Sequence, residues 1–117
     1  MPESFRPLLL LALLAAVVAL AGCSALALGD VRYADGNYSV AIDNNGPPSG
    51  AIVQVTAYRI SGWSQEEDGT VFQPVTLVTG HNIITLTAGL GPGRYKLYVY
   101  LIRNNSRETA VIRDIGV

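Results

Sequence analysis

Cysteine, histidine and tryptophan each occur only once in this chain of 117 residues. A single cysteine, Cys23, cannot form a disulfide within the chain, so the protein must be stable through its apolar core. The single histidine, His81, has no neighbouring nucleophile or metal ligand in the sequence, and we expect it to lie in a turn.

Charged residues are few, and the two signs balance. Eight Lys and Arg residues are set against nine Asp and Glu residues, which gives a net charge of −1, and the signs are interspersed. Nucleic-acid binding requires a basic patch or stripe, which this chain lacks. We therefore expect no nucleic-acid partner.

The motifs of common enzyme classes are also missing. The chain has no Gly-x-Ser-x-Gly elbow, no His-Glu-x-x-His pair and no phosphate-binding loop. Glu66, Glu67 and Asp68 are consecutive, whereas the ligands of a calcium loop alternate, so we expect a solvated loop tip there. We expect no enzymatic activity, no bound metal and no cofactor.

The N-terminal segment has the layout of a secretory signal. A short polar start with Arg6 precedes an apolar run from residue 8 to residue 21, and small residues follow. The residues Leu20-Ala21-Gly22-Cys23 resemble the lipobox of prokaryotic lipoproteins. This resemblance implies a signal peptide over residues 1–22, a diacylglycerol on the Cys23 thiol, and a membrane lipid as the anchor.

A second interpretation of this segment remains open. From Leu8 to Leu28 the run is broken only by Gly22, Cys23 and Ser24, and about 20 apolar residues can cross a bilayer as a helix. The chain would then be a subunit of a membrane complex, held by an uncleaved helix. Both interpretations place the rest of the chain outside the cytoplasm, at a cell membrane or an outer membrane, where a cell-envelope enzyme is the least favoured class.

The rest of the chain alternates apolar and polar residues with a period of two, which is typical of β-strands. After a tether over residues 23–37, we expect strands at 38–43, 51–60, 71–79, 83–88, 94–103 and 109–117, with residues 30–33 as an optional seventh. Residues 61–70 are expected to form a polar loop ending in an Asp68-Gly69 hairpin turn. Pro74 predicts an edge strand or a bulge. The pattern predicts an all-β sandwich over residues 38–117.

One corner of this domain resembles a known family. The stretch Leu90-Gly91-Pro92-Gly93-Arg94-Tyr95 resembles the corner before strand F in immunoglobulin-like and fibronectin type III-like domains. In those domains a tyrosine hydroxyl returns to the backbone, in the tyrosine corner. The resemblance implies this role for Tyr95 and an immunoglobulin-like sandwich of six to seven strands.

Aromatic residues mark a candidate binding surface. Tyr58, Tyr98 and Tyr100 lie opposite the core residues of their strands, and with Trp63 they would form an apolar-aromatic patch. Such patches bind partners, here a cell-envelope protein or a glycan, although cross-strand pairing that stabilises the sheet would also explain them. Asn37 and Asn104 begin Asn-x-Ser sequences, which are acceptors for N-glycosylation where the cell performs it.

Overall fold

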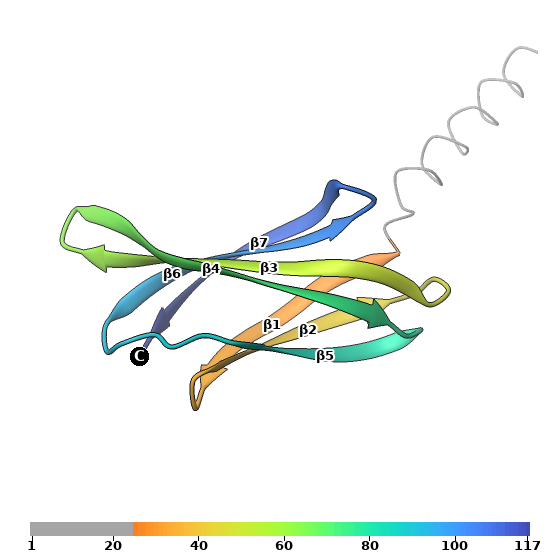
Figure 1. Ribbon diagram of the computed structural model, residues 1–117, viewed down its shortest axis with the longest axis horizontal. Helices are drawn as coiled ribbons and strands as arrows, with labels where there is room; N and C mark the ends of the chain where they lie inside the picture. Colours follow the sequence, from red (N-terminus) through yellow and green to blue (C-terminus); the bar gives the residue numbers. More distant parts are fainter. Residues whose placement is uncertain (1–24) are drawn as a thin grey trace, which may run out of the picture.

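A computed structural model describes residues 25–117, which form two antiparallel sheets (Figure 1). The strands are β1 (Leu26–Ala34), β2 (Asn37–Asn44), β3 (Ser49–Ser61), β4 (Ser64–Leu77), β5 (Gly80–Thr87), β6 (Arg94–Arg103) and β7 (Ser106–Gly116). One sheet has the order β1-β2-β5 and the other the order β4-β3-β6-β7. The expectation of an all-β chain, consistent with a sandwich, is confirmed.

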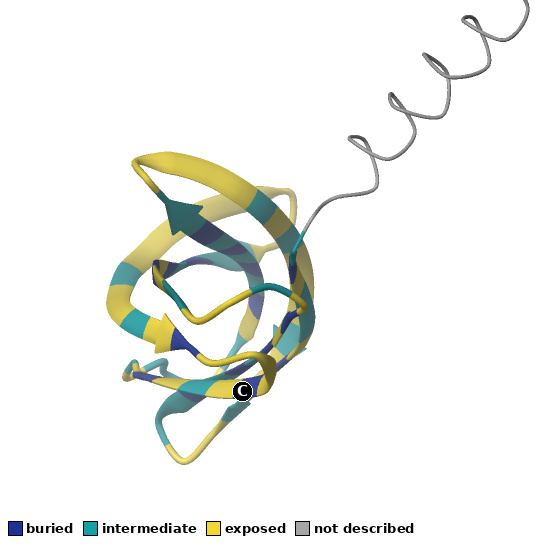
Figure 2. Ribbon diagram, turned by 90° about the vertical axis from the view of Figure 1, so that its right-hand side faces the viewer, coloured by how far each residue is buried: buried dark blue, intermediate teal, exposed yellow. Residues whose placement is uncertain are grey.

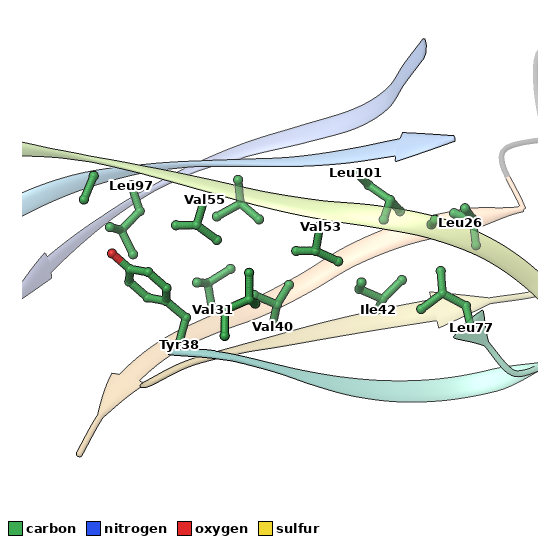
Figure 3. Close-up of a cluster of buried hydrophobic side chains, with 14 of the residues drawn as sticks. Leu26, Val31, Tyr38, Val40, Ile42, Val53, Val55, Leu77, Leu97 and Leu101 are labelled. Atoms are coloured by element: carbon green, nitrogen blue, oxygen red, sulfur yellow. The ribbon is translucent and has the colours of Figure 1, made fainter. Parts of the chain in front are cut away.

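The core fills the space between the two sheets. In β6 the alternate residues Leu97, Val99 and Leu101 are fully buried, and in β3 Val53 and Val55 are buried in the same way. Figure 3 shows side chains from both sheets pointing toward one another, and Figure 2 shows buried positions alternating with more exposed ones along the strands. Because each strand turns every second residue toward this core, the opposite residues form the outer faces of the two sheets.

The domain begins earlier than the sequence predicts. Residues 26–34 form the strand β1, whereas we expected a tether with an optional strand at residues 30–33 only. The strand is longer because Leu26 and Val31 are both buried and help to close the core. A transmembrane helix extending to Leu28 is therefore also wrong at its last three residues. Cys23, the signal peptide over residues 1–22 and the rest of the proposed helix lie outside the described residues. Within residues 25–117 no helix is long and apolar enough to cross a membrane.

The hairpin between β3 and β4 corrects a second expectation. The chain turns at Gly62-Trp63, and residues 64–70 continue β4 instead of forming a loop. Asp68 lies at a bulge within β4, because Ala57 pairs with Gly69 whereas Tyr58 pairs with Glu67. The hairpin projects beyond the rest of the sandwich (Figure 1). Pro74 lies in β4, which is an edge strand, as the proline predicts.

Two buried asparagines fix the end of the sandwich where β1 begins, which we call the N-terminal pole. The Asn44 side chain donates to the backbone oxygens of Pro47 and Leu77 and accepts from the Gly46 amide. Asn82 in β5 accepts from the Val78 amide and donates to the carbonyl oxygens of Ile42, Val78 and Gly80. These bonds satisfy backbone groups that the connections after β2 and after β4 would otherwise leave unpaired.

A tyrosine fixes the crossover from β5 to β6 at the opposite pole. The buried Tyr95 hydroxyl donates to the Gly91 carbonyl at 2.8 Å and accepts from Arg59 Nη2 at 2.7 Å. The Arg59 guanidinium also lies over the Tyr95 ring, 5.2 Å from its centroid. A Cβ added at Gly93, whose φ is +154°, would lie 3.2 Å from Arg59 Nη1. The hydrogen bond from the Tyr95 hydroxyl to the Gly91 carbonyl confirms the predicted return of this hydroxyl to the backbone.

A second tyrosine, from the other sheet, holds the same crossover. The Tyr33 hydroxyl donates to the Ala88 carbonyl at 3.0 Å and accepts from the Leu90 amide at 3.0 Å. Because Tyr33 belongs to β1 and Tyr95 to β6, the crossover is tied to both layers of the sandwich.

Replacing Tyr95 with Phe tests how much this corner contributes to stability. We expect Y95F to lower the free energy of unfolding by about 1–3 kcal/mol, because the Gly91 carbonyl and the Arg59 guanidinium lose a shared partner. The measurement is denaturant unfolding of the full chain, compared with Y98F. Among residues 25–117 the Tyr98 hydroxyl has no hydrogen bond, so Y98F should change stability by less than about 0.5 kcal/mol. Equal stability of the two variants would contradict this role for Tyr95.

Candidate binding surface

The outer face of the four-stranded sheet exposes several large apolar side chains. Three of its side chains are large, hydrophobic and exposed: Phe72 at 61%, Ile112 at 53% and Ile52 at 37%. They lie on β4, β7 and β3, so the apolar surface extends from one edge of the sheet to the other. Large apolar side chains exposed on one face are candidates for an interaction site.

Tyrosines from the two central strands complete this face. Tyr98 pairs directly with Thr56, and Tyr100 pairs with Gln54, on the side of the sheet opposite the buried Val99. The Tyr58 ring meets the Tyr98 ring edge-on, with 5.1 Å between centroids. Such pairing adds to sheet stability, so these rings serve the fold as well as the surface.

An arginine covers the third tyrosine. The Arg107 guanidinium of β7 lies 4.1 Å from the centroid of the Tyr100 ring. This cation–π contact covers the Tyr100 ring and places a positive charge near the N-terminal pole of the face. The neighbouring Arg103 pairs with Glu108.

Trp63 does not join this face. It lies in the turn of the β3–β4 hairpin and is fully exposed, whereas Tyr58, Tyr98 and Tyr100 lie within the sheet. Glu66 and Glu67 follow it on β4 and pair with Arg59 and Tyr58 of β3, which places the two carboxylates on opposite sides of the hairpin. No group of three or more potential metal ligands occurs within residues 25–117.

Sequence reasoning missed Ile52, Phe72 and Ile112. Each has an apolar neighbour in the sequence, so alternation alone does not show which residue faces the core. Strand pairing resolves this, because Phe72 lies opposite Gln54, and Ile112 lies opposite Tyr98. We therefore define the outer face by Ile52, Tyr58, Phe72, Tyr98, Tyr100 and Ile112.

The outer face of the three-stranded sheet carries a different feature. His81 belongs to β5, not to a turn, and its Nδ1 lies 2.7 Å from the Asp43 carboxylate on β2. This pair lines a shallow pocket of about 350 Å³, whose lining also includes Gly29, Ser39 and Ala41. Ser39 is four residues from Asp43 along one strand, about 13 Å away, which is too far for the serine to act with the His81 pair as a nucleophile.

A small pocket of about 110 Å³ lies beside the buried Tyr38 and the β4 bulge at Asp68. Burial raises the pKa of Tyr38 from 10.0 to about 12, with smaller contributions from Tyr33, Asp68 and Tyr95. The folded state therefore favours the neutral phenol, and this contribution to stability is lost only as the pH rises from 10 toward 12. At neutral pH the Tyr38 hydroxyl is therefore protonated and uncharged.

The two candidate glycosylation sites differ in their surroundings. Asn104 is exposed in the β6–β7 turn, where it adopts a φ of 54°, and its side chain is open to solvent. Asn37 is half-buried at the start of β2, and its side chain donates to the Asp35 carbonyl at 3.4 Å.

Comparison with known proteins supports the fold alone. No family model matches the chain, and no curated protein matches it. Among solved structures the chain is similar to one described as a "putative beta-galactosidase from Bacteroides fragilis", with 17% identity and a TM-score of 0.53. The similarity covers 80% of this chain but only 16% of that protein, so it concerns one domain of a much longer chain.

Proposed function

We propose that this chain is an exported lipoprotein, anchored through Cys23, whose immunoglobulin-like sandwich binds a partner in a non-catalytic role. The observation that carries the binding role is the outer face of the four-stranded sheet, where Phe72, Ile112 and Ile52 are exposed together. Burying such side chains contributes about 25 cal/mol per Å² of apolar surface, which makes this face the strongest candidate for a contact.

Two structural features support the immunoglobulin-like assignment. The order β4-β3-β6-β7 places the fourth strand beside the third, as strand C′ lies beside C in the C′CFG sheet of related domains. The Tyr95 hydroxyl bonds to the backbone four residues upstream, as in a tyrosine corner.

The position of β1 leaves only a short linker between the proposed lipid anchor at Cys23 and the folded domain. Leu26, the first buried residue, follows Cys23 by three residues, which span about 10 Å when extended. In the proposed protein the N-terminal pole therefore lies close to the membrane. The strands run away from the membrane, and the outer face is presented along its side, where neighbouring proteins in the same membrane can reach it.

The anchor is tested by the intact mass of the protein purified from its native membrane. We expect a chain that begins at Cys23 and carries added acyl mass, and we expect C23S to retain its signal peptide without acylation. A full-length chain that begins at Met1 and lacks acyl mass would contradict the lipoprotein proposal. It would support the alternative, in which the protein is a subunit of a membrane complex held by an uncleaved N-terminal helix.

The binding role is tested by removing the tyrosines of the outer face. We expect the double variant Y98S/Y100S to remain folded, because both rings lie outside the core, but to lose its native-membrane partner at least ten-fold in co-purification after cross-linking. The matched control is I83S, which removes an exposed apolar side chain from the other sheet. Partner recovery that is the same for both variants would refute the assignment of this face.

A further inference from the structure

We propose that the free edge of β5 binds one extended peptide segment of a partner protein, which adds a fourth strand to the three-stranded sheet. This site is separate from the outer face of the four-stranded sheet and does not depend on the lipid anchor. The edge of β5 is unprotected, the core residues beside it are incompletely covered, and the space there fits a single strand.

The other three edge strands carry features that hinder the addition of another strand. β1 has a bulge between Leu28 and Val31. β4 has Pro74 and the bulge at Asp68, and β7 has a bulge at Glu108. Proteins blunt exposed sheet edges with bulges, prolines and charges of this kind.

β5 carries none of these features. It pairs with β2 over eight consecutive residues without a shift, and it contains no proline and no Asp, Glu, Lys or Arg. Four of the five residues from 83 to 87 are β-branched, which favours a strand. Within residues 25–117, the backbone groups on the outer edge of this stretch have no hydrogen-bond partner. Such a row of donors and acceptors is complementary to another extended backbone, so the occupant is a peptide segment and not a glycan or a lipid.

The core is incompletely covered beside this edge. Val71 and Gln73 of β4 pair with the buried Val55 and Val53 of β3, so they lie on the inward side of their sheet. Gln73 is nevertheless exposed, and Val71 is only half-buried, as is the inward-facing Ile84 of β5. We call the place between these three residues the β4–β5 seam. An apolar strand that covered the seam would remove this surface from water, which is favourable.

The seam is one strand wide. β1 packs beside β7, so the strand orders place β5 opposite β3, and the next position in the three-stranded sheet lies opposite β4. Neighbouring strands are about 4.8 Å apart and packed sheets about 10 Å apart, so a strand paired with β5 lies over the inward side of β4. Figure 1 shows β4 and β5 diverging from their connection at residues 78–79. The room for the added strand is therefore beside residues 83–87.

A second copy of the chain does not fit the seam through its own β5. Antiparallel pairing of two β5 strands leaves the four-stranded sheets of both copies on the same side of the joined sheet. Because each four-stranded sheet extends one strand beyond β5, β4 of each copy would then occupy the place of β3 of the other. The seam accepts a single strand without such a collision.

The seam also selects the side chains of the added strand. Strand side chains alternate between the two faces, so every second one is directed inward against Val71, Val75 and Ile84 and has to be apolar. The pocket of about 110 Å³ beside Tyr38 and Leu90 lies at the end of the seam and would receive one of these side chains. In strand addition the backbone bonds supply affinity, and such pockets supply specificity.

Hydrogen exchange of the β5 amides tests the added strand. The full-length chain in detergent is mixed with an excess of the peptide acetyl-Thr-Val-Thr-Val-Thr-Val-amide, which alternates polar and apolar side chains. We expect the edge-facing amides of residues 83–87 to exchange at least ten-fold more slowly with the peptide than without it. Two control peptides carry N-methyl groups on alternate sets of amides. One set should abolish the effect and the other should preserve it, because a strand pairs with β5 through only one of its edges.

Two matched variants of the chain locate the peptide. Gln73→Arg puts a long charged side chain into the seam without removing a core residue, and it should raise the peptide concentration needed for protection at least ten-fold. Thr76→Arg puts the same charge on the outward side of the same strand, where Thr76 is exposed, and should leave that concentration unchanged. Equal effects of the two substitutions would overturn the seam as the binding site.

Three further results would also overturn the proposal. The first is an absence of protection of residues 83–87 at every peptide concentration up to the solubility limit. The second is protection by both N-methylated peptides, which would show binding without backbone pairing. The third is protection that arises without peptide and increases with the concentration of the chain, which would make a second copy the occupant. The outer face of the four-stranded sheet is tested separately by Y98S/Y100S, so the failure of one site is distinguishable from the failure of the other.

Discussion

The pairing of β3 with β6 is the interaction on which the rest of the structure depends. The two strands form the centre of the four-stranded sheet, and their inward residues, among them Val53, Val55 and Val99, are fully buried. Within residues 25–117 there is no cysteine, so no disulfide supplements this contact. The sandwich is stabilised by burying apolar side chains between the sheets and by polar residues that hold each end.

The two ends are held in different ways. At the N-terminal pole, Asn44 and Asn82 satisfy the backbone groups of the connections. At the opposite pole, Tyr95, Tyr33 and Arg59 fix the crossover between the sheets. The backbone pairing of β4, β3, β6 and β7 fixes the register of the four-stranded sheet, so the side chains of its outer face are presented in a set order. A fixed order of large and small groups is what specific packing against another surface requires.

The sequence predicts most of this fold where one face of a strand is buried and the other is not. In β6 the alternation of Tyr95, Leu97, Val99 and Leu101 identifies both the strand and its inward side. The alternation of apolar and polar residues does not reveal β1, because a bulge between Leu28 and Val31 shifts the inward residues from even to odd positions. Alternation also does not reveal the hairpin around Trp63, because both faces of its strands are exposed and only the backbone pairing defines the strands there. The candidate surface was predicted only in part, since Phe72 has apolar neighbours and is assigned to the outer face by its pairing with Gln54.

The most direct test of the account compares the accessibility of two side chains of similar exposure. In the single chain Phe72 is 61% exposed and Ile83 is 58% exposed, and they lie on the outer faces of opposite sheets. Hydroxyl-radical labelling of each residue is measured in native membranes and in dilute purified monomer. The account predicts that labelling of Phe72 falls several-fold in the membranes while labelling of Ile83 stays the same. Equal labelling of Phe72 in the two preparations would contradict the claim that this face is an interaction surface.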